Sequence, residues 1–192
     1  MIYLLIVSYL IGSISSAVII CKILGIPDPR TQGSKNPGAT NVLRLGGKKI
    51  AGFVLTFDGL KGATPVIIGH YLEFGLTQLT LIILCAFLGH IFPVFFRFRG
   101  GKGVATYLGG LIAINLLAGL IFSVIWLLVA KVLKTSSLAA LIATALSPFY
   151  FYLITGDLRS TAIIGLISLL IFYTHRGNIK RLINKEEDVI QS

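Results

Sequence analysis

The chain has 192 residues, of which 55% are hydrophobic and 12% are charged, and its mean hydropathy is +0.90. Soluble domains carry roughly 25% charged residues, so this composition excludes a soluble enzyme, a secreted disulfide scaffold and a disordered protein. The net charge of +10 is explained in a membrane protein by Lys and Arg gathered in cytoplasmic loops, without a nucleic-acid partner. We therefore predict an all-α polytopic membrane protein with a single integral-membrane domain over residues 1–192.

Seven apolar stretches are predicted to be transmembrane helices, because they approach or reach the length that crosses a bilayer. In chain order they are Ile2–Leu24, Ile50–Leu72, Leu76–Phe98, Val104–Leu116, Leu117–Leu133, Leu138–Ile154 and Thr161–Thr174. The run from 104 to 133 is too long for one span, and Asn115 marks the turn that divides it. With the N-terminus outside, fifteen of the seventeen basic residues fall on the cytoplasmic side, leaving Arg159 outside and Lys61 within the second span. The positive-inside rule therefore predicts an external N-terminus and a cytoplasmic C-terminus.

The first cytoplasmic loop contains the segment Gly33–Arg44, which is rich in glycine and short polar residues. Such a loop makes tight turns and can point several backbone N–H groups at one anion. Thr40 or Asn41 would cap a short helix whose N-terminus favours an anion, and Arg44 would supply a bidentate fork for phosphate. A polar turn with an orienting charge explains the pattern equally well.

A second basic segment, Arg97–Thr106, places three glycines around Lys102. It lacks the Walker A spacing, and by itself it is better explained as a flexible turn with inside-positive charge. Because both glycine-rich basic segments are expected on the same membrane face, they would converge on one polyanionic ligand.

The third polar segment, Thr174–Leu182, follows the last predicted span. His175 and Asn178 are three residues apart and would share a helical face. His175 would orient a phosphate, move a proton or anchor the helix at the interface. The tail from Lys185 onward is expected to be solvated.

Polar residues elsewhere have simpler explanations. Asp58 and Lys61, spaced i,i+3 in a span, are expected to form a structural ion pair, with a role in shaping the site floor as the alternative. His90 is expected to be a packing histidine. Ser137 lies at the start of the sixth span, where its hydroxyl would cap the helix or face a cytoplasmic pocket.

Taken together, these motifs resemble the PlsY family of bacterial acyl-phosphate-dependent glycerol-3-phosphate acyltransferases. The matching segments are Gly12–Ser13, Ser34–Arg44, Gly89–Val94, Gly100–Thr106 and His175–Leu182. Ser15 and Asn184 stand where this family usually has proline and glycine, outside the presumed phosphate pocket. The resemblance implies transfer of a fatty acyl group from acyl phosphate to the 1-hydroxyl of glycerol 3-phosphate, giving lysophosphatidic acid and phosphate. It also implies a site on the cytoplasmic side of the bacterial inner membrane, contact with membrane lipid and no use of acyl-CoA.

The resemblance and the clusters give a set of expected site residues. Lys102, Arg44, His175 and Asn178 are expected to be catalytic, whereas Ser34, Asn36, Gly38, Ala39, Thr40, Asn41, Gly101, Gly103 and Ser137 are expected to bind substrate phosphate. No metal or other cofactor is expected, and a monomer is anticipated. The proton acceptor is left open between a phosphate oxygen of the donor and His175.

An organophosphate or anion transporter is the alternative function. Basic loops and seven spans suit it, but a transporter needs a polar path through the membrane. Apart from Asp58 and Lys61, the centres of the predicted spans carry no charged residue.

Overall fold

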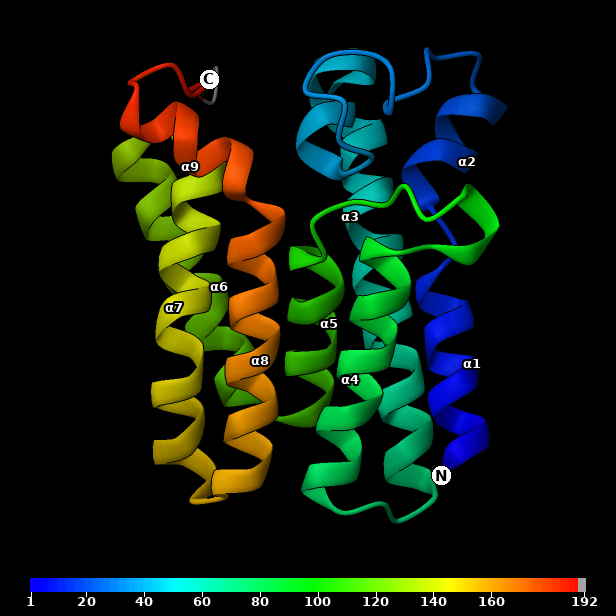
Figure 1. Ribbon diagram of the computed structural model, residues 1–192, viewed down its shortest axis with the longest axis vertical. Coiled ribbons are helices and arrows are strands. Elements are labelled where there is room, and N and C mark those ends of the chain that lie inside the picture. The colour runs from blue at the N-terminus through cyan, green and yellow to red at the C-terminus, as the bar shows by residue number, and fades with distance from the viewer. Residues whose placement is uncertain (190–192) are drawn as a thin grey trace.

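The computed structural model describes residues 1–189, and its regular elements over that range are all helical (Figure 1). They are α1 (Ile2–Gly12), α2 (Ser16–Ile23), α3 (Ala39–Tyr71), α4 (Leu76–Ile91), the 3₁₀ turn η1 (Val94–Phe96), α5 (Val104–Ile114), α6 (Leu116–Leu133), α7 (Ser136–Thr155), α8 (Leu158–Thr174) and α9 (Arg176–Ile183). The start of α1 lies at the end of the bundle opposite α9 (Figure 1).

Four segments are long and apolar enough to cross a membrane: α3, Leu76–Phe96, α6 and α7. The pairs α1–α2 and α8–α9, bent by 41° and 60°, bring the number to six if each pair counts as one span. Helix α5 has 11 residues and rises only about 16 Å, so it is too short to cross alone. Every predicted span thus contains a helix, whereas the total of seven stays a prediction.

The first predicted span is not one continuous helix. Ser13 turns its hydroxyl back to the carbonyl of Tyr9 at 2.8 Å, and Ser15 has extended backbone before α2 begins. At this break the carbonyl oxygen of Ile14 accepts a hydrogen bond from Lys61 Nζ at 3.0 Å. The interruption therefore gives a buried lysine a backbone partner.

Two other helix boundaries differ from the predicted spans by more than three residues. Helix α3 begins at Ala39 rather than Ile50, with a kink at Gly47, whose φ of 83° lies in the left-handed region. Its first turns are polar, so hydropathy alone does not reveal them. Helix α4 ends at Ile91 rather than Phe98, because Pro93 has no N–H to continue the helix.

The turn predicted at Asn115 is confirmed. Asn115 is the N-cap of α6, and its side-chain oxygen accepts a hydrogen bond from the backbone N–H of Ala118 at 2.9 Å. This cap separates α5 from α6 and lets the chain reverse direction.

Glycines allow α3 and α5 to touch through their backbones. A Cβ at Gly62 would lie 1.9 Å from the carbonyl oxygen of Thr106, and one at Gly109 would lie 2.0 Å from that of Gly59. Small residues of this kind permit close helix contact in membranes, where lipid supplies no hydrophobic force between helices.

The two sides of the bundle, α1–α5 and α6–α9, share one apolar core (Figure 1). Phe87, Tyr107, Phe122 and Phe151, from α4 to α7, are fully buried within it. Many large apolar side chains on the outside remain exposed, as expected for a surface that faces lipid.

Candidate active site

A cavity of about 320 Å³ is lined by residues of α9, of the loop that contains Lys102 and of several other helices. Its polar lining comes from Ser34, Asn36, Thr40, Arg44, Asp58, His90, Lys102, Ser123, Ser136, Ser137, His175, Asn178, Arg181, Glu187 and Asp188. Its other lining residues are Gly38, Ala39, Leu55, Gly103, Val104, Ala105, Leu108, Phe122, Trp126, Leu127 and Ala140. The structure therefore brings all of the expected site residues to one cavity except Asn41 and Gly101.

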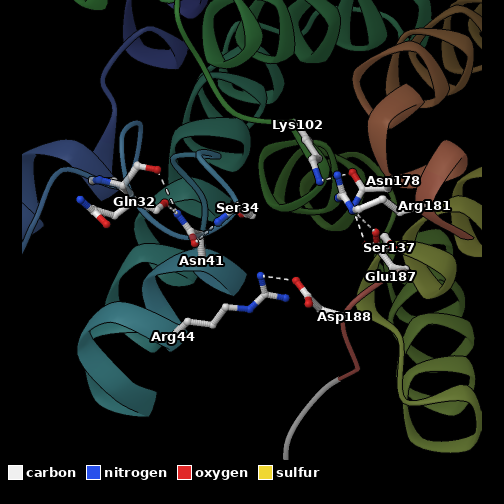
Figure 2. Close-up of polar contacts among 11 residues, drawn as sticks. Gln32, Ser34, Asn41, Arg44, Lys102, Ser137, Asn178, Arg181, Glu187 and Asp188 are labelled. Atoms are coloured by element: carbon white, nitrogen blue, oxygen red, sulfur yellow. Dashed lines mark hydrogen bonds and ion pairs between the residues drawn. The ribbon is translucent and has the colours of Figure 1, made fainter. Parts of the chain in front are cut away.

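Asn41 holds the loop before α3 in shape. Its side chain is almost fully buried and accepts a hydrogen bond from the N–H of Ser34 at 2.9 Å, while its amide donates to the carbonyls of Pro29 at 2.9 Å and Gln32 at 3.0 Å (Figure 2). These contacts use both ends of the amide group. In this structure Asn41 is a positioning residue that sets the loop from which Ser34 reaches the cavity.

The helix cap in this loop differs from the expected one. Gly38 is the N-cap of α3, so Thr40 and Asn41 lie in the first helical turn and neither is the cap. Glycine suits the cap because a Cβ at this position would lie 2.8 Å from the side-chain nitrogen of Asn36. As a result, Ala39 and Thr40 line the cavity at a helix N-terminus, where the dipole favours an anion.

The glycines around Lys102 pack against the end of α4. The N–H of Gly101 donates to the carbonyl of His90 at 3.2 Å, and a Cβ at Gly100 would lie 2.0 Å from that same oxygen. Gly103 is the N-cap of α5 with a φ of 84°. These glycines therefore let the loop pack closely on the end of α4, which places Lys102 at the cavity. Gly101 lies beside His90 and not in the cavity lining.

Lys102 and Asn178 connect α9 to the α4–α5 loop. Lys102 Nζ donates to the side-chain oxygen of Asn178, whose amide donates to Glu187 (Figure 2). Burial lowers the pKa of Lys102 to about 8; the carboxylate of Glu187 opposes this shift, and the charges of Arg181 and Arg44 add to it. A cation that is poorly solvated and close to other cations attracts an added anion strongly.

His175 lies between α8 and α9 and is buried. Its Nδ1 lies 2.8 Å from the carbonyl oxygen of Ile171; since a carbonyl cannot donate, Nδ1 carries the proton and Nε2 keeps its lone pair. Burial and then the charge of Lys102 lower the pKa of His175 to about 4, against the opposing effects of the Ile171 carbonyl and Glu187. The imidazole is therefore neutral at pH 7.

The segment after α9 is largely exposed up to residue 189, as predicted, but Glu187 and Asp188 within it make specific contacts; residues 190–192 lie outside the described part. Glu187 accepts hydrogen bonds from Ser137 Oγ at 2.7 Å, Arg181 Nε at 2.7 Å and the amide of Asn178 (Figure 2). Asp188 forms an ion pair with Arg44 at 2.9 Å. Ser137, expected to bind phosphate, thus uses its hydroxyl to hold this segment.

Arg181, Glu187 and Asp188 line the cavity but are not among the site residues predicted from the sequence. Arg181 lies three residues after Asn178 on α9, so helical spacing alone places both on one face. The acidic run 186–188 directly follows this basic helix, in a chain with seven acidic residues. The opposite charges of α9 and the acidic run 186–188 were the signal in the sequence that could have predicted a contact between them.

The predicted ion pair between Asp58 and Lys61 is confirmed beneath the cavity. Lys61 Nζ lies 2.8 Å from Asp58 Oδ1, which also accepts a hydrogen bond from Ser16 Oγ at 2.8 Å. His90 Nδ1 lies 3.2 Å from Thr106 Oγ1. Because Asp58 and His90 also line the cavity, this buried network forms part of its floor.

No group of three His, Cys, Asp or Glu side chains within residues 1–189 is arranged to hold a metal ion. The mouth of the cavity instead carries three cations, Arg44, Lys102 and Arg181, beside two carboxylates, Glu187 and Asp188. Apolar side chains of α5 and α6 line another part of the cavity.

Fold and cavity define a helical integral membrane protein with a polar cavity at which cations outnumber carboxylates near the mouth and apolar side chains line the rest. A family model described as glycerol-3-phosphate acyltransferase matches residues 2–185. A glycerol-3-phosphate acyltransferase from Ruthia magnifica subsp. Calyptogena magnifica is 62% identical over 98% of this chain and 96% of its own length. One from Hydrogenovibrio crunogenus is 48% identical over 96% of this chain and 88% of its own length.

Two crystal structures of PlsY (YgiH), an integral membrane glycerol 3-phosphate acyltransferase, are similar to this fold. The glycerol 3-phosphate form has a TM-score of 0.94 and 38% identity, covering 99% of this chain and 95% of the other. The lysophosphatidic acid form has a TM-score of 0.90 and 36% identity, with coverages of 98% and 94%. The chain belongs to the glycerol-3-phosphate acyltransferase family of the PlsY type, which confirms the resemblance seen in its motifs.

Proposed function

We propose that this protein transfers a fatty acyl group from an acyl phosphate to the 1-hydroxyl of glycerol 3-phosphate, yielding lysophosphatidic acid and inorganic phosphate. One observation carries the proposal: Arg44, Lys102 and Arg181, from three separate elements, line one cavity together with apolar side chains of α3, α5 and α6. Membership of an acyltransferase family gives the alternative function, transport, no support.

The cationic mouth suits two phosphorylated substrates. Both carry negative charge, and bringing them together costs Coulomb repulsion unless nearby cations offset it. Arg44 supplies a fork for a phosphate, whereas Lys102 supplies a compact charge beside Asn178. Ser34 and the first turn of α3 add hydrogen-bond donors on the same side of the cavity.

The apolar part of the cavity suits the fatty acyl chain of the donor. It is lined by Leu55 of α3, Leu108 of α5, and Trp126 and Leu127 of α6. Leu55 is 52% exposed and Leu127 is 61% exposed, so the lining continues onto the lipid-facing surface. A donor with one end in the bilayer would therefore reach the cationic mouth with its phosphate without leaving the membrane.

The chemical step needs little activation of the donor, because an acyl phosphate is already a mixed anhydride. The 1-hydroxyl oxygen attacks the acyl carbon, the bond from that carbon to the bridging phosphate oxygen breaks, and the hydroxyl proton passes to a phosphate oxygen of the donor. Lys102 and Arg44 stabilise the departing phosphate and the charge that develops in the transition state. Alignment of both substrates in one cavity supplies the proximity contribution.

His175 is the rival proton acceptor, and its replacement separates the two mechanisms. With a pKa of about 4 it is a weak base, so we assign it a substrate-orienting role through the free lone pair of Nε2. His175→Gln is expected to keep kcat within about tenfold of the wild type with the same pH profile, whereas loss of a general base costs 10²–10⁴-fold. A loss of that larger size with unchanged substrate affinity would instead make His175 the base.

We propose that the chain crosses the bacterial inner membrane seven times as a monomer, with its N-terminus outside and the cavity on the cytoplasmic side. The distribution of Lys and Arg supports this orientation. Helix α5 starts partway into the bundle after the Lys102 loop, which accounts for its short length (Figure 1). Single cysteines at exposed Glu73 and Lys134, in a variant without Cys21 and Cys85, should be labelled by a membrane-impermeant thiol reagent from the outside and the cytoplasm respectively.

The donor is identified by assaying purified protein in detergent with glycerol 3-phosphate and either palmitoyl phosphate or palmitoyl-CoA. Phosphate release and lysophosphatidic acid formation in equal amounts are expected with palmitoyl phosphate alone. Product formation from palmitoyl-CoA at a comparable rate would contradict the proposed donor. Uptake of glycerol 3-phosphate into sealed vesicles without product would instead support transport.

A further inference from the structure

The segment after α9 places two residues of its acidic run 186–188 at the mouth of the candidate active site. Glu187 and Asp188 both line the cavity, but their surroundings differ. The Glu187 side chain is 9% exposed and accepts three hydrogen bonds, whereas the Asp188 side chain is 64% exposed. Within residues 1–189, the one ion pair of Asp188 is with Arg44. Glu187 therefore anchors the segment, and Asp188 reaches from that anchor to Arg44.

The Arg44–Asp188 pair joins the two sides of the cavity. Arg44 belongs to α3, while Asp188 is tied through Glu187 to Ser137 of α7 and Asn178 of α9 (Figure 2). The pair thus lies across the opening, and its carboxylate occupies the guanidinium to which we assign a substrate phosphate.

We propose that Asp188 is an intrachain competitor for the phosphate of a substrate at Arg44, so that the segment Glu187–Asp188 forms a displaceable strap over the cavity. The inference rests on the proposed function for the identity of the ligand as an organophosphate. A carboxylate offers arginine two oxygens in the same fork geometry as a phosphate but carries less charge than a phosphate dianion, which displaces it. The anchored Glu187 keeps Asp188 at high effective concentration near Arg44.

The size of the effect follows from exposure. Arg44 is 37% exposed and Asp188 64% exposed, so the pair is screened by solvent and contributes weakly. Removing such a competitor is expected to tighten phosphate binding roughly two- to fivefold. A substrate must overcome this cost each time it enters the cavity.

The test is calorimetric titration of the purified full-length protein in detergent, comparing the wild type with Asp188→Asn. Two probes are titrated separately, glycerol 3-phosphate and a non-hydrolysable acyl phosphonate, since either phosphate could occupy Arg44. The dissociation constant of at least one probe should fall roughly two- to fivefold in Asp188→Asn. Unchanged or weaker binding of both probes overturns the proposal.

Glu186→Gln is the matched control. It removes one negative charge two residues before Asp188, and the Glu186 side chain is exposed and does not line the cavity. Its affinities should equal those of the wild type, and a gain equal to that of Asp188→Asn would overturn the proposal by assigning the effect to net charge. Because titration measures binding, it decides the role of Asp188 separately from turnover. Tighter binding in a protein that transfers no acyl group would overturn the proposed function and leave the strap intact.

Discussion

Lys102→Ala is expected to lower kcat/KM for acyl transfer by about 10²–10³-fold, the loss typical of removing one group that stabilises a developing charge in a closed site. Lys102 is the one lysine among the cavity-lining residues of the described chain, and it is hydrogen-bonded to Asn178. Its substitution would remove the donor to the side-chain oxygen of Asn178 and leave the mutual repulsion of the two substrate phosphates less offset. Steady-state rates at varied concentrations of both substrates measure this loss.

The pH dependence gives an independent check on Lys102. A lysine is charged below its pKa, so the part of kcat/KM that depends on the cation should be complete below pH 7 and should fall as pH rises through about 8. Bound phosphate favours the charged form of Lys102, so the fall in kcat should come at a higher pH than the fall in kcat/KM. Lys102→Arg, which stays charged, should lose the fall near pH 8. The same alkaline fall in Lys102→Arg and the wild type would assign it to another group.

Arg44→Ala is expected to lower kcat/KM by roughly 10- to 100-fold, because hydrogen bonds to charged groups contribute more than neutral ones. The loss should appear largely as a raised KM for the substrate whose phosphate Arg44 binds. Arg44→Lys should recover only part of the activity, because an ammonium cannot replace a bidentate guanidinium. Initial rates with each substrate varied in turn identify which phosphate is affected.

Arg159→Ala is the control for both substitutions. Arg159 is exposed near the start of α8 and does not line the cavity. Its substitution should therefore leave kcat/KM within about twofold of the wild type. Equal losses in Lys102→Ala, Arg44→Ala and Arg159→Ala would indicate general destabilisation and contradict a phosphate-binding role for the first two.

The helical membrane class was predictable from the apolar composition. The convergence of the two basic segments was predictable because the distribution of Lys and Arg places both on one membrane face. Asn115 is an example: together with the nearby glycines it predicted the turn between α5 and α6, and the structure adds that it caps α6. Arg44 and Lys102 were identifiable as cavity residues because each lies in a polar segment with glycines, the pattern expected of a phosphate-binding loop.

Features that depend on contacts between distant segments were not predictable in the same way. The amide of Asn41 could be expected to bind an anion, but its actual partners are the carbonyls of Pro29 and Gln32, which only the folded loop brings near. The break between α1 and α2 likewise frees the carbonyl of Ile14 to accept a hydrogen bond from Lys61, which lies 47 residues further along the chain. The contacts of Glu187 and Asp188 were not predictable either, because Ser137 and Arg44, two of their partners, lie on α7 and α3.

The central claim is that both phosphorylated substrates occupy one cavity together and that the acyl group passes directly between them. Initial rates measured with acyl phosphate and glycerol 3-phosphate both varied test this claim most directly. Direct transfer predicts double-reciprocal lines that intersect, because a complex with both substrates must form before phosphate leaves. Parallel lines, with phosphate released in the absence of glycerol 3-phosphate, would indicate a covalent acyl-enzyme and contradict the account.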